Sequence, residues 1–217
     1  MNEGRWLQVG GAGGILFVVL QFGFSLVGAS GEPPFDASAK DWLTSYRNSH
    51  DLFLAVPYVA GLPLLGFVLF VCALHVKLRV AGNSEHVPSI AVLLFGGVAA
   101  AMLLASIGSG AAALLRVGHG LDESGASTLS GLANEFFVMS WFAIGGLLLG
   151  AGLGAVSSHT LPTWLGWSGS VIGLGSVAAV AGQLTAFWLI PFWLFYAWVV
   201  AVSVALIRGA RSTPMPS

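Results

Sequence analysis

Long apolar runs separated by short polar segments dominate the sequence. Six of these runs have close to the roughly 20 residues that an α-helix needs to cross a bilayer. The pattern predicts an all-α polytopic membrane protein whose residues 1–217 form a single six-helix transmembrane bundle. The expected spans are about 11–29, 51–76, 88–115, 131–156, 163–184 and 186–207.

The polar segment between the first two spans has a helical pattern of its own. From Ala39 to Tyr46, apolar side chains recur at i, i+3, i+4 and i+7, which places them on one face of a helix. Ser38 and Asp41 have the spacing of a capping-box variant at its start. We expect a short amphipathic interfacial helix on the membrane surface, with Trp42 and Tyr46 at the level of the lipid headgroups.

Prolines and small residues predict how the spans bend and pack. Pro57 and Pro63 in the second span and Pro191 in the sixth should bend their helices, because each removes an amide donor. Small residues recur at every fourth position of the third span, and three glycines do so in the fourth. Such rows favour a close contact between the two helices. The rows are Gly97, Ala101, Ala105, Ser109 and Ala113 in the third span, and Gly146, Gly150 and Gly154 in the fourth.

Composition indicates that lipid surrounds most of the chain. The 217 residues are 56% hydrophobic and 8% charged, whereas a soluble domain is about 25% charged. The formal net charge of −1 gives no electrostatic basis for binding nucleic acid. Cys72 is the one cysteine, which excludes an internal disulfide.

Six spans place both termini on one side of the membrane, and the distribution of cations indicates which side. The side with the termini would carry five Lys and Arg residues, and the other side three. The positive-inside rule then places both termini in the cytoplasm, in a multi-pass protein of the cell (plasma or inner) membrane. The cations are Arg5, Lys77, Arg79, Arg208 and Arg211 on the first side, and Lys40, Arg47 and Arg116 on the second.

Glu135 is the first candidate for an ion or proton site. It lies about one turn inside the outer end of the fourth span, and an intramembrane acid is a functional hypothesis by default. Arg116 should lie at a similar depth if the third and fourth spans pack as expected. A structural Glu135–Arg116 ion pair is therefore the alternative. A path for protons or cations from Glu135 would pass Gln21 or Gln183.

Aromatic residues in the first half of the sixth span extend deeper than an interfacial belt. Trp188, Trp193, Tyr196 and Trp198, with Tyr58 from the second span, are candidates to line a pocket. Such a pocket would suit a lipid tail, a quinone or another apolar small molecule. The alternative is aromatic packing against neighbouring helices and lipid.

Histidine and carboxylate side chains at the outer end offer a further hypothesis. His50, Asp51 and His119 are of the types that bind zinc or another divalent metal. They lie in no recognised ligand spacing, so solvated loop residues and helix caps are the alternative. The five histidines fall at helix ends or in loops and give no buried pair for haem. No cofactor is expected.

Two short stretches carry a family resemblance. They are Asp36-Ala37-Ser38-Ala39-Lys40-Asp41, with Tyr46 after it, and Leu161-Pro162-Thr163-Trp164-Leu165-Gly166-Trp167. With six spans of this spacing, the chain resembles a broad group of six-helix bacterial membrane proteins, best known from actinobacteria. The resemblance implies the six-helix architecture over nearly the whole chain and implies no particular activity.

Three functions are open on the sequence alone. Scarce ionisable groups and abundant small-residue packing favour a non-enzymatic accessory module that contacts membrane lipids and holds a lipid or an apolar small molecule. A small proton- or cation-coupled transporter or channel that uses Glu135 is the first alternative. A membrane metalloenzyme with an outer His, Asp and Glu site is the second.

Overall fold

The computed structural model describes residues 3–28, 33–34, 36–53, 59, 61–81, 86–181 and 189–211, except for the side chains of 24–28, 49–53, 81, 181 and 211. Every regular element in these residues is helical, which confirms the predicted all-α class. The elements are α1 (Glu3–Gly28), α2 (Ala39–Phe53), α4 (Leu62–Ala81), α5 (Val87–Arg116), the 3-10 turn η1 (Val117–His119), α6 (Glu123–Ser158), α7 (Thr163–Ala181) and α8 (Leu189–Arg211).

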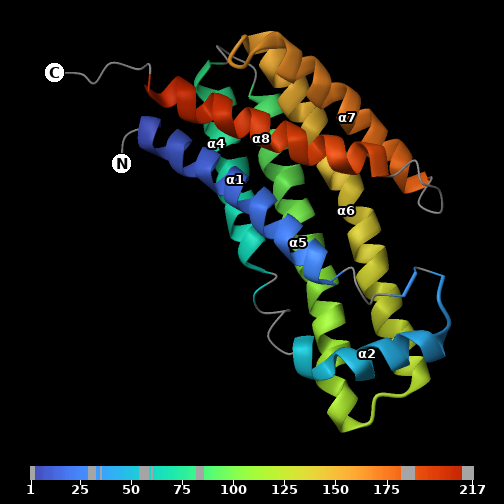
Figure 1. The fold of residues 1–217 in the computed structure, drawn as a ribbon. Helices are drawn as coiled ribbons and strands as arrows, with labels where there is room; N and C mark the ends of the chain where they lie inside the picture. The colour runs from blue at the N-terminus through green and yellow to red at the C-terminus, as the bar shows by residue number, and fades with distance from the viewer. Residues whose placement is uncertain are drawn as a thin grey trace.

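Six helices of the described chain are long and apolar enough to cross a membrane, as predicted: α1, α4, α5, α6, α7 and α8. They form one bundle (Figure 1). In it α1 packs against α4 and α8, α4 against α5, α5 against α6, α6 against α7, and α7 against α8, so the six close a ring. Both ends of the described chain lie at one end of the bundle, because a methyl group built on Gly4 would lie 3.4 Å from the Ala210 carbonyl oxygen.

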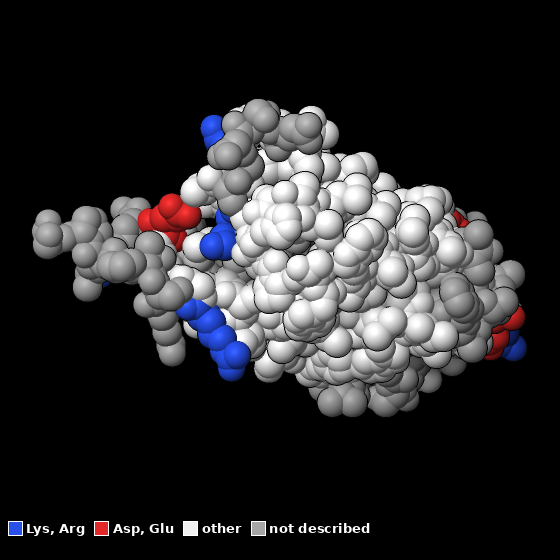
Figure 2. Space-filling model, turned by 90° about the horizontal axis from the view of Figure 1, so that it is seen from above, with Lys and Arg blue, Asp and Glu red and all other residues white. Residues whose placement is uncertain are grey.

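Charged side chains in the view of Figure 2 gather towards the two ends of the molecule and leave a broad uncharged face between them. Large apolar side chains on the bundle, among them Leu94 and Val98 of α5, are exposed. An exposed apolar surface of this extent marks an interaction site, and for helices of these lengths the partner is the acyl region of a bilayer.

The helix α6 is much longer than the helix beside it. Its 36 residues extend about 54 Å, and the 19 residues of α7 extend about 28 Å. Gly145 faces Gly173 and Gly152 faces Gly166, so α7 follows only the C-terminal part of α6. The other part of α6 and the end of α5 extend beyond the bundle as a helical hairpin (Figure 1). We call residues 106–133 the overhang, because the Ser106 hydroxyl donates to the Ala133 carbonyl at 2.8 Å at its base.

The amphipathic helix α2 lies across the overhang (Figure 1). The Trp42 ring is only 8% exposed, because it packs on protein. The predicted short helix between the first two spans is confirmed, and its apolar face packs on α5 and α6. The level of Trp42 relative to the lipid headgroups stays a prediction. The second hydrophobic core formed there comprises Trp42, Leu43, Ala113, Leu121 and Ala126.

The start of α2 confirms the predicted capping pair. The Ser38 hydroxyl donates to the Asp41 carboxylate at 2.7 Å, and the Asp41 backbone N–H donates to the Ser38 hydroxyl at 3.2 Å. Asp51 belongs to α2, so the second membrane helix begins at Leu62 and not near Asp51 as expected.

Pro63 lies at a helix start. It is the second residue of α4, directly after the turn residue Gly61. In a first turn the missing N–H has no intrahelical partner to lose, so Pro63 breaks no hydrogen bond and the predicted bend there is wrong. Pro57 and residues 182–188, which precede Pro191 and the described start of α8, lie outside the described residues, so the bends at Pro57 and Pro191 stay predictions.

The predicted contact between the third and fourth spans is half right. The glycine row of α6 faces α5: a methyl group on Gly146 would meet the Phe95 ring at 2.6 Å, and one on Gly150 would meet the Pro88 carbonyl oxygen at 3.2 Å. On α5, however, Gly97 is exposed and has nothing within 4 Å. The buried glycine is its neighbour Gly96, because α5 must also contact α4 and this turns Gly97 outward.

Candidate functional site

Aromatic rings from four helices meet inside the bundle. Phe17 of α1 lies 5.1 Å from Phe67 of α4 and 5.7 Å from Tyr196 of α8, between ring centroids. Trp141 of α6 completes the set, 5.8 Å from Phe195. These separations are within the range of favourable aromatic pairs. We call this network, together with the Phe70–Trp198 pair in the same core, the aromatic cluster: Phe17, Phe22, Phe67, Phe70, Phe137, Trp141, Phe192, Trp193, Phe195, Tyr196 and Trp198.

Trp141 differs from the other buried tryptophan of the cluster. The Trp198 indole N–H donates to the Leu165 carbonyl at 2.9 Å, which links α8 to α7. The Trp141 indole N–H is buried and has no hydrogen-bond partner among the described residues, although the side chain is only 6% exposed. A buried donor without an acceptor costs roughly 1–3 kcal/mol. The cluster therefore contains one unmet donor.

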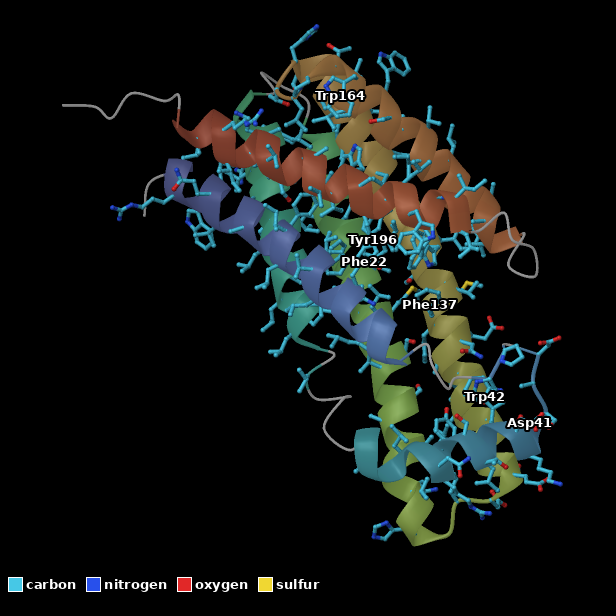
Figure 3. All side chains as sticks on the ribbon, viewed as in Figure 1. Phe22, Asp41, Trp42, Phe137, Trp164 and Tyr196 are labelled. Carbon is cyan, nitrogen blue, oxygen red and sulfur yellow. The ribbon has the colours of Figure 1, made fainter. Side chains whose placement is uncertain are left out.

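A row of rings connects Trp141 to the surface of the bundle. The Phe192 ring lies 5.5 Å from Trp141 and 5.4 Å from Trp193, and Trp193 is 52% exposed. Phe22 of α1 stands beside this row, 5.1 Å from Trp193 and 5.4 Å from Tyr196. Figure 3 shows Phe22 next to Tyr196, with Phe137 of α6 below them. The outer edge of the cluster is thus formed by half-buried rings of α1, α6 and α8.

The residues predicted to line a pocket have separate positions. Tyr196 and Trp198 are buried in the core, and Trp193 is exposed at its edge. Trp188 and Tyr58 lie outside the described residues. The pocket itself stays a prediction.

Glu135 and Arg116 do not lie at the same depth. Both are exposed, and the Ser106–Ala133 hydrogen bond sets the register between their helices. In that register the two residues are about 18 Å apart along the axis. The expectation of a Glu135–Arg116 ion pair fails because α6 begins at Glu123 and not near Gly131, so Glu135 lies 12 residues into α6, whereas Arg116 is the last residue of α5.

Glu135 also faces outward. It shares a stripe with Met139 and Phe142 at i, i+4 and i+7, and both of these side chains are exposed. Of the two glutamines proposed for an internal path, Gln21 is half-buried in α1 and Gln183 lies outside the described residues. A role for Glu135 as an ion or proton site stays a prediction.

The described residues give the metal hypothesis no geometric support. Over the part of the chain that the structure describes, no three His, Cys, Asp or Glu side chains come together in a way that could hold a metal ion. His119 is exposed and its Nδ1 lies 3.1 Å from the Leu115 carbonyl oxygen. The side chains of His50 and Asp51 are outside the description, so their part of the hypothesis stays untested.

Trp141 was missed by sequence reasoning. It lies in the run Phe136-Phe137-Val138-Met139-Ser140-Trp141-Phe142, four aromatics in seven residues of the fourth span. This aromatic run was the signal that the sequence offered. In the bundle, Trp141 packs on Phe192 and Phe195 of the sixth span.

The closed ring of six apolar helices and the uncharged face between two charged ends define the class: a polytopic, multi-pass membrane protein. Comparison with known protein families, curated proteins and solved structures finds no match. The six helices confirm the architecture that the family resemblance implied. The comparisons identify no family.

Proposed function

We propose that this chain is a non-enzymatic membrane module that holds an apolar small molecule or a lipid tail against the aromatic cluster. One observation carries the proposal: the Trp141 indole N–H is buried among rings and has no acceptor in the described part of the chain. An apolar molecule with a carbonyl oxygen would supply ring contacts and the missing acceptor together. Ligand sites of this kind are mostly apolar with a few placed polar groups.

Entry from the lipid side is the route that the ring positions support. Trp193 is exposed, and Phe192 stands between it and Trp141. The half-buried Phe192 ring swings aside when a ligand enters, and the carbonyl of the ligand then reaches the indole N–H. Phe192 is the fourth residue of α8, so its backbone is held in the helix while its ring rotates.

The Trp141→Phe variant tests this assignment, since it keeps an aromatic ring and removes only the N–H and part of the indole. The probe is a decyl-substituted benzoquinone, titrated by calorimetry into protein in detergent micelles. Wild-type protein should bind it saturably, and the variant should bind roughly 5- to 10-fold more weakly, which corresponds to one lost hydrogen bond. Without probe, the variant should be at least as stable as wild type, because no buried donor remains unpaired.

Decylbenzene, which has no acceptor, is the matched control ligand. It should bind wild type and Trp141→Phe within a factor of two of each other, because neither complex contains the hydrogen bond (a factor of two is about 0.4 kcal/mol). Equal quinone affinity in the two proteins, or a variant that is clearly less stable without probe, would show that Trp141 has a purely structural role.

The remaining two functions have no comparable observation in their favour. Glu135 is exposed on an outward stripe, and the described residues contain no cluster of metal ligands. We therefore advance neither a transporter nor a metalloenzyme.

We further propose that the end with the termini faces the cytoplasm. Arg5, Lys77, Arg79 and Arg208 lie at this end, and its described acid is Glu3, so the positive-inside rule supports this orientation. A reporter that is active only in the cytoplasm should be active when fused after Ser217 and inactive when inserted at Gly120, in the turn between α5 and α6. The opposite pair of activities would reverse the orientation.

A further inference from the structure

The interior around Trp141 offers a ligand one hydrogen-bond donor and no charge. Apart from tryptophans and Tyr196, the polar side chains that are buried in the described part of the chain are all serines. No Lys, Arg, His, Asp or Glu of those residues is buried. Ser140, next to Trp141 in the chain, already donates its hydroxyl to the Phe137 carbonyl at 2.6 Å. The indole N–H therefore lies where a charged ligand group has no counter-charge.

The cations of α1, α4 and α8 lie far along their helices from the rings around Trp141. The distances along the axes are about 15 Å from Phe67 to Lys77, about 18 Å from Phe17 to Arg5 and about 20 Å from Phe195 to Arg208. On α6 the nearest charge is the exposed Glu135, about 9 Å from Trp141 along the axis. That charge is negative, so the surroundings of Trp141 favour no anion.

The chemistry of the free donor decides which head group fits. A cationic head has no lone pair for the Trp141 N–H, so the donor stays unpaired. An anionic head accepts this hydrogen bond, but it must leave water for a place with a single donor. A buried charge without a partner costs far more than a buried neutral polar group. A neutral carbonyl oxygen gains the same hydrogen bond at a much lower cost of desolvation.

The burial of the neighbouring rings sets the direction of the ligand. On the inner side of Trp141 stand Phe195, Phe17 and Phe67, each at most 2% exposed. On the outer side, the half-buried Phe192 and the exposed Trp193 lead to lipid. A molecule that reaches the indole from lipid must carry its acceptor at its leading end, and its chain then extends back past Trp193. The ester carbonyls of a phospholipid adjoin a charged headgroup and do not fit this order.

We infer that the ligand of the aromatic cluster enters head-first and has a compact, neutral carbonyl head on an apolar chain. Fatty-acid anions, phospholipids and cationic amphiphiles are then weak ligands. The inference rests on the ligand site proposed above and narrows it to one chemical class. Alkylquinones and long-chain ketones share this chemistry, since both combine a terminal neutral carbonyl with a chain that is soluble in lipid.

The test compares ligands of similar chain length that differ in the head. The decyl-substituted benzoquinone, methyl decyl ketone, dodecanoate and dodecyltrimethylammonium are each titrated by calorimetry into wild-type protein in detergent micelles. The medium is held at about pH 8, where a carboxyl group is ionised. Each neutral head should bind at least about tenfold more tightly than either charged head. The tighter of the two neutral heads tells a ring carbonyl from a chain carbonyl.

Photolabelling tests the direction of the chain. Two derivatives of the quinone carry a diazirine, one at the far end of the decyl chain and one beside the ring, and the labelled residues are mapped by mass spectrometry. The far-end group should label Trp193 or Ile190, which are both exposed on α8. The group beside the ring should label Trp141 or Phe195. The reverse pattern would overturn head-first entry.

Failure of this inference differs from failure of the proposed function. If dodecanoate or the ammonium compound binds as tightly as either neutral ligand, while Trp141→Phe still weakens quinone binding, the head class is wrong and the ligand site remains. If none of the four compounds binds saturably, the ligand site itself is wrong, and the inference fails with it.

Discussion

The Gly152→Leu variant should fail to give a folded, monodisperse bundle. A methyl group on Gly152 would lie 2.6 Å from the Gly166 carbonyl oxygen and 2.8 Å from the Ser170 amide nitrogen, so even the first carbon of a side chain collides with the backbone of α7. Backbone atoms of a helix cannot move aside as a flexible side chain can. The two helices must separate, and we expect a cost above about 3 kcal/mol, the upper range for overpacked cores.

Gly97→Leu on α5 is the matched control for this prediction. Nothing lies within 4 Å of a methyl group at Gly97, and the residue is exposed. Leucine is also a better helix former than glycine by about 0.8 kcal/mol, so the control should be as stable as wild type or slightly more stable. Size-exclusion profiles and thermal unfolding in detergent measure both variants. A folded Gly152→Leu protein, or a Gly97→Leu protein that aggregates, would contradict the helix contacts described above.

The Trp198→Ala variant should lose about 3–5 kcal/mol of stability, the range for truncating a large buried aromatic. Trp198 is 3% exposed, packs 6.3 Å from Phe70 in an edge-on arrangement, and donates its N–H to Leu165 across the α7–α8 contact. Truncation removes the packing on α4 and the link to α7 together. The midpoint of thermal unfolding, followed by circular dichroism in micelles, should fall by several degrees.

Trp193→Ala tests whether burial decides this effect. Trp193 belongs to the same helix and the same residue type but is 52% exposed. Its replacement should change stability by less than about 1 kcal/mol, because most of its surface contacts lipid in both the native and the partly unfolded state. Comparable losses in Trp193→Ala and Trp198→Ala would mean that the α7–α8 link has no special role.

Periodicity was enough to predict the number of spans, because the thickness of a bilayer sets the length of apolar helix that crosses it. It did not predict every boundary, since the second span begins at Leu62 and not near Asp51. It did not predict which face of a helix meets which neighbour. The four-residue row through Gly97 has the spacing of a helix contact. Gly96 is nevertheless the residue that packs, because α5 contacts both α4 and α6. Such a choice depends on three helices together and is not present in the pattern of any one.

The amphipathic helix illustrates a second limit. An apolar face that includes Trp42 is equally compatible with a lipid surface and with a protein surface, because both remove the ring from water. The overhang of α5 and α6 provides the protein surface on which α2 packs. How far α6 extends beyond α7 depends on the register between these two helices, which the sequence pattern does not show. The same limit applies to the aromatic cluster. The Trp141 indole N–H lacks an acceptor because the fold surrounds it with rings, and the pattern of a single span does not show this.

The order of elements along the chain has a consequence for how the protein is made. The ribosome completes α2 long before α6, yet among the described residues the apolar side of α2 packs on α5, on α6 and on the turn between them. During translation Trp42 and Leu43 must therefore wait, uncovered or resting on the bilayer, until the later hairpin has crossed the membrane. Docking of α2 is therefore a late step of biogenesis, because it requires the α5–α6 hairpin to be inserted first.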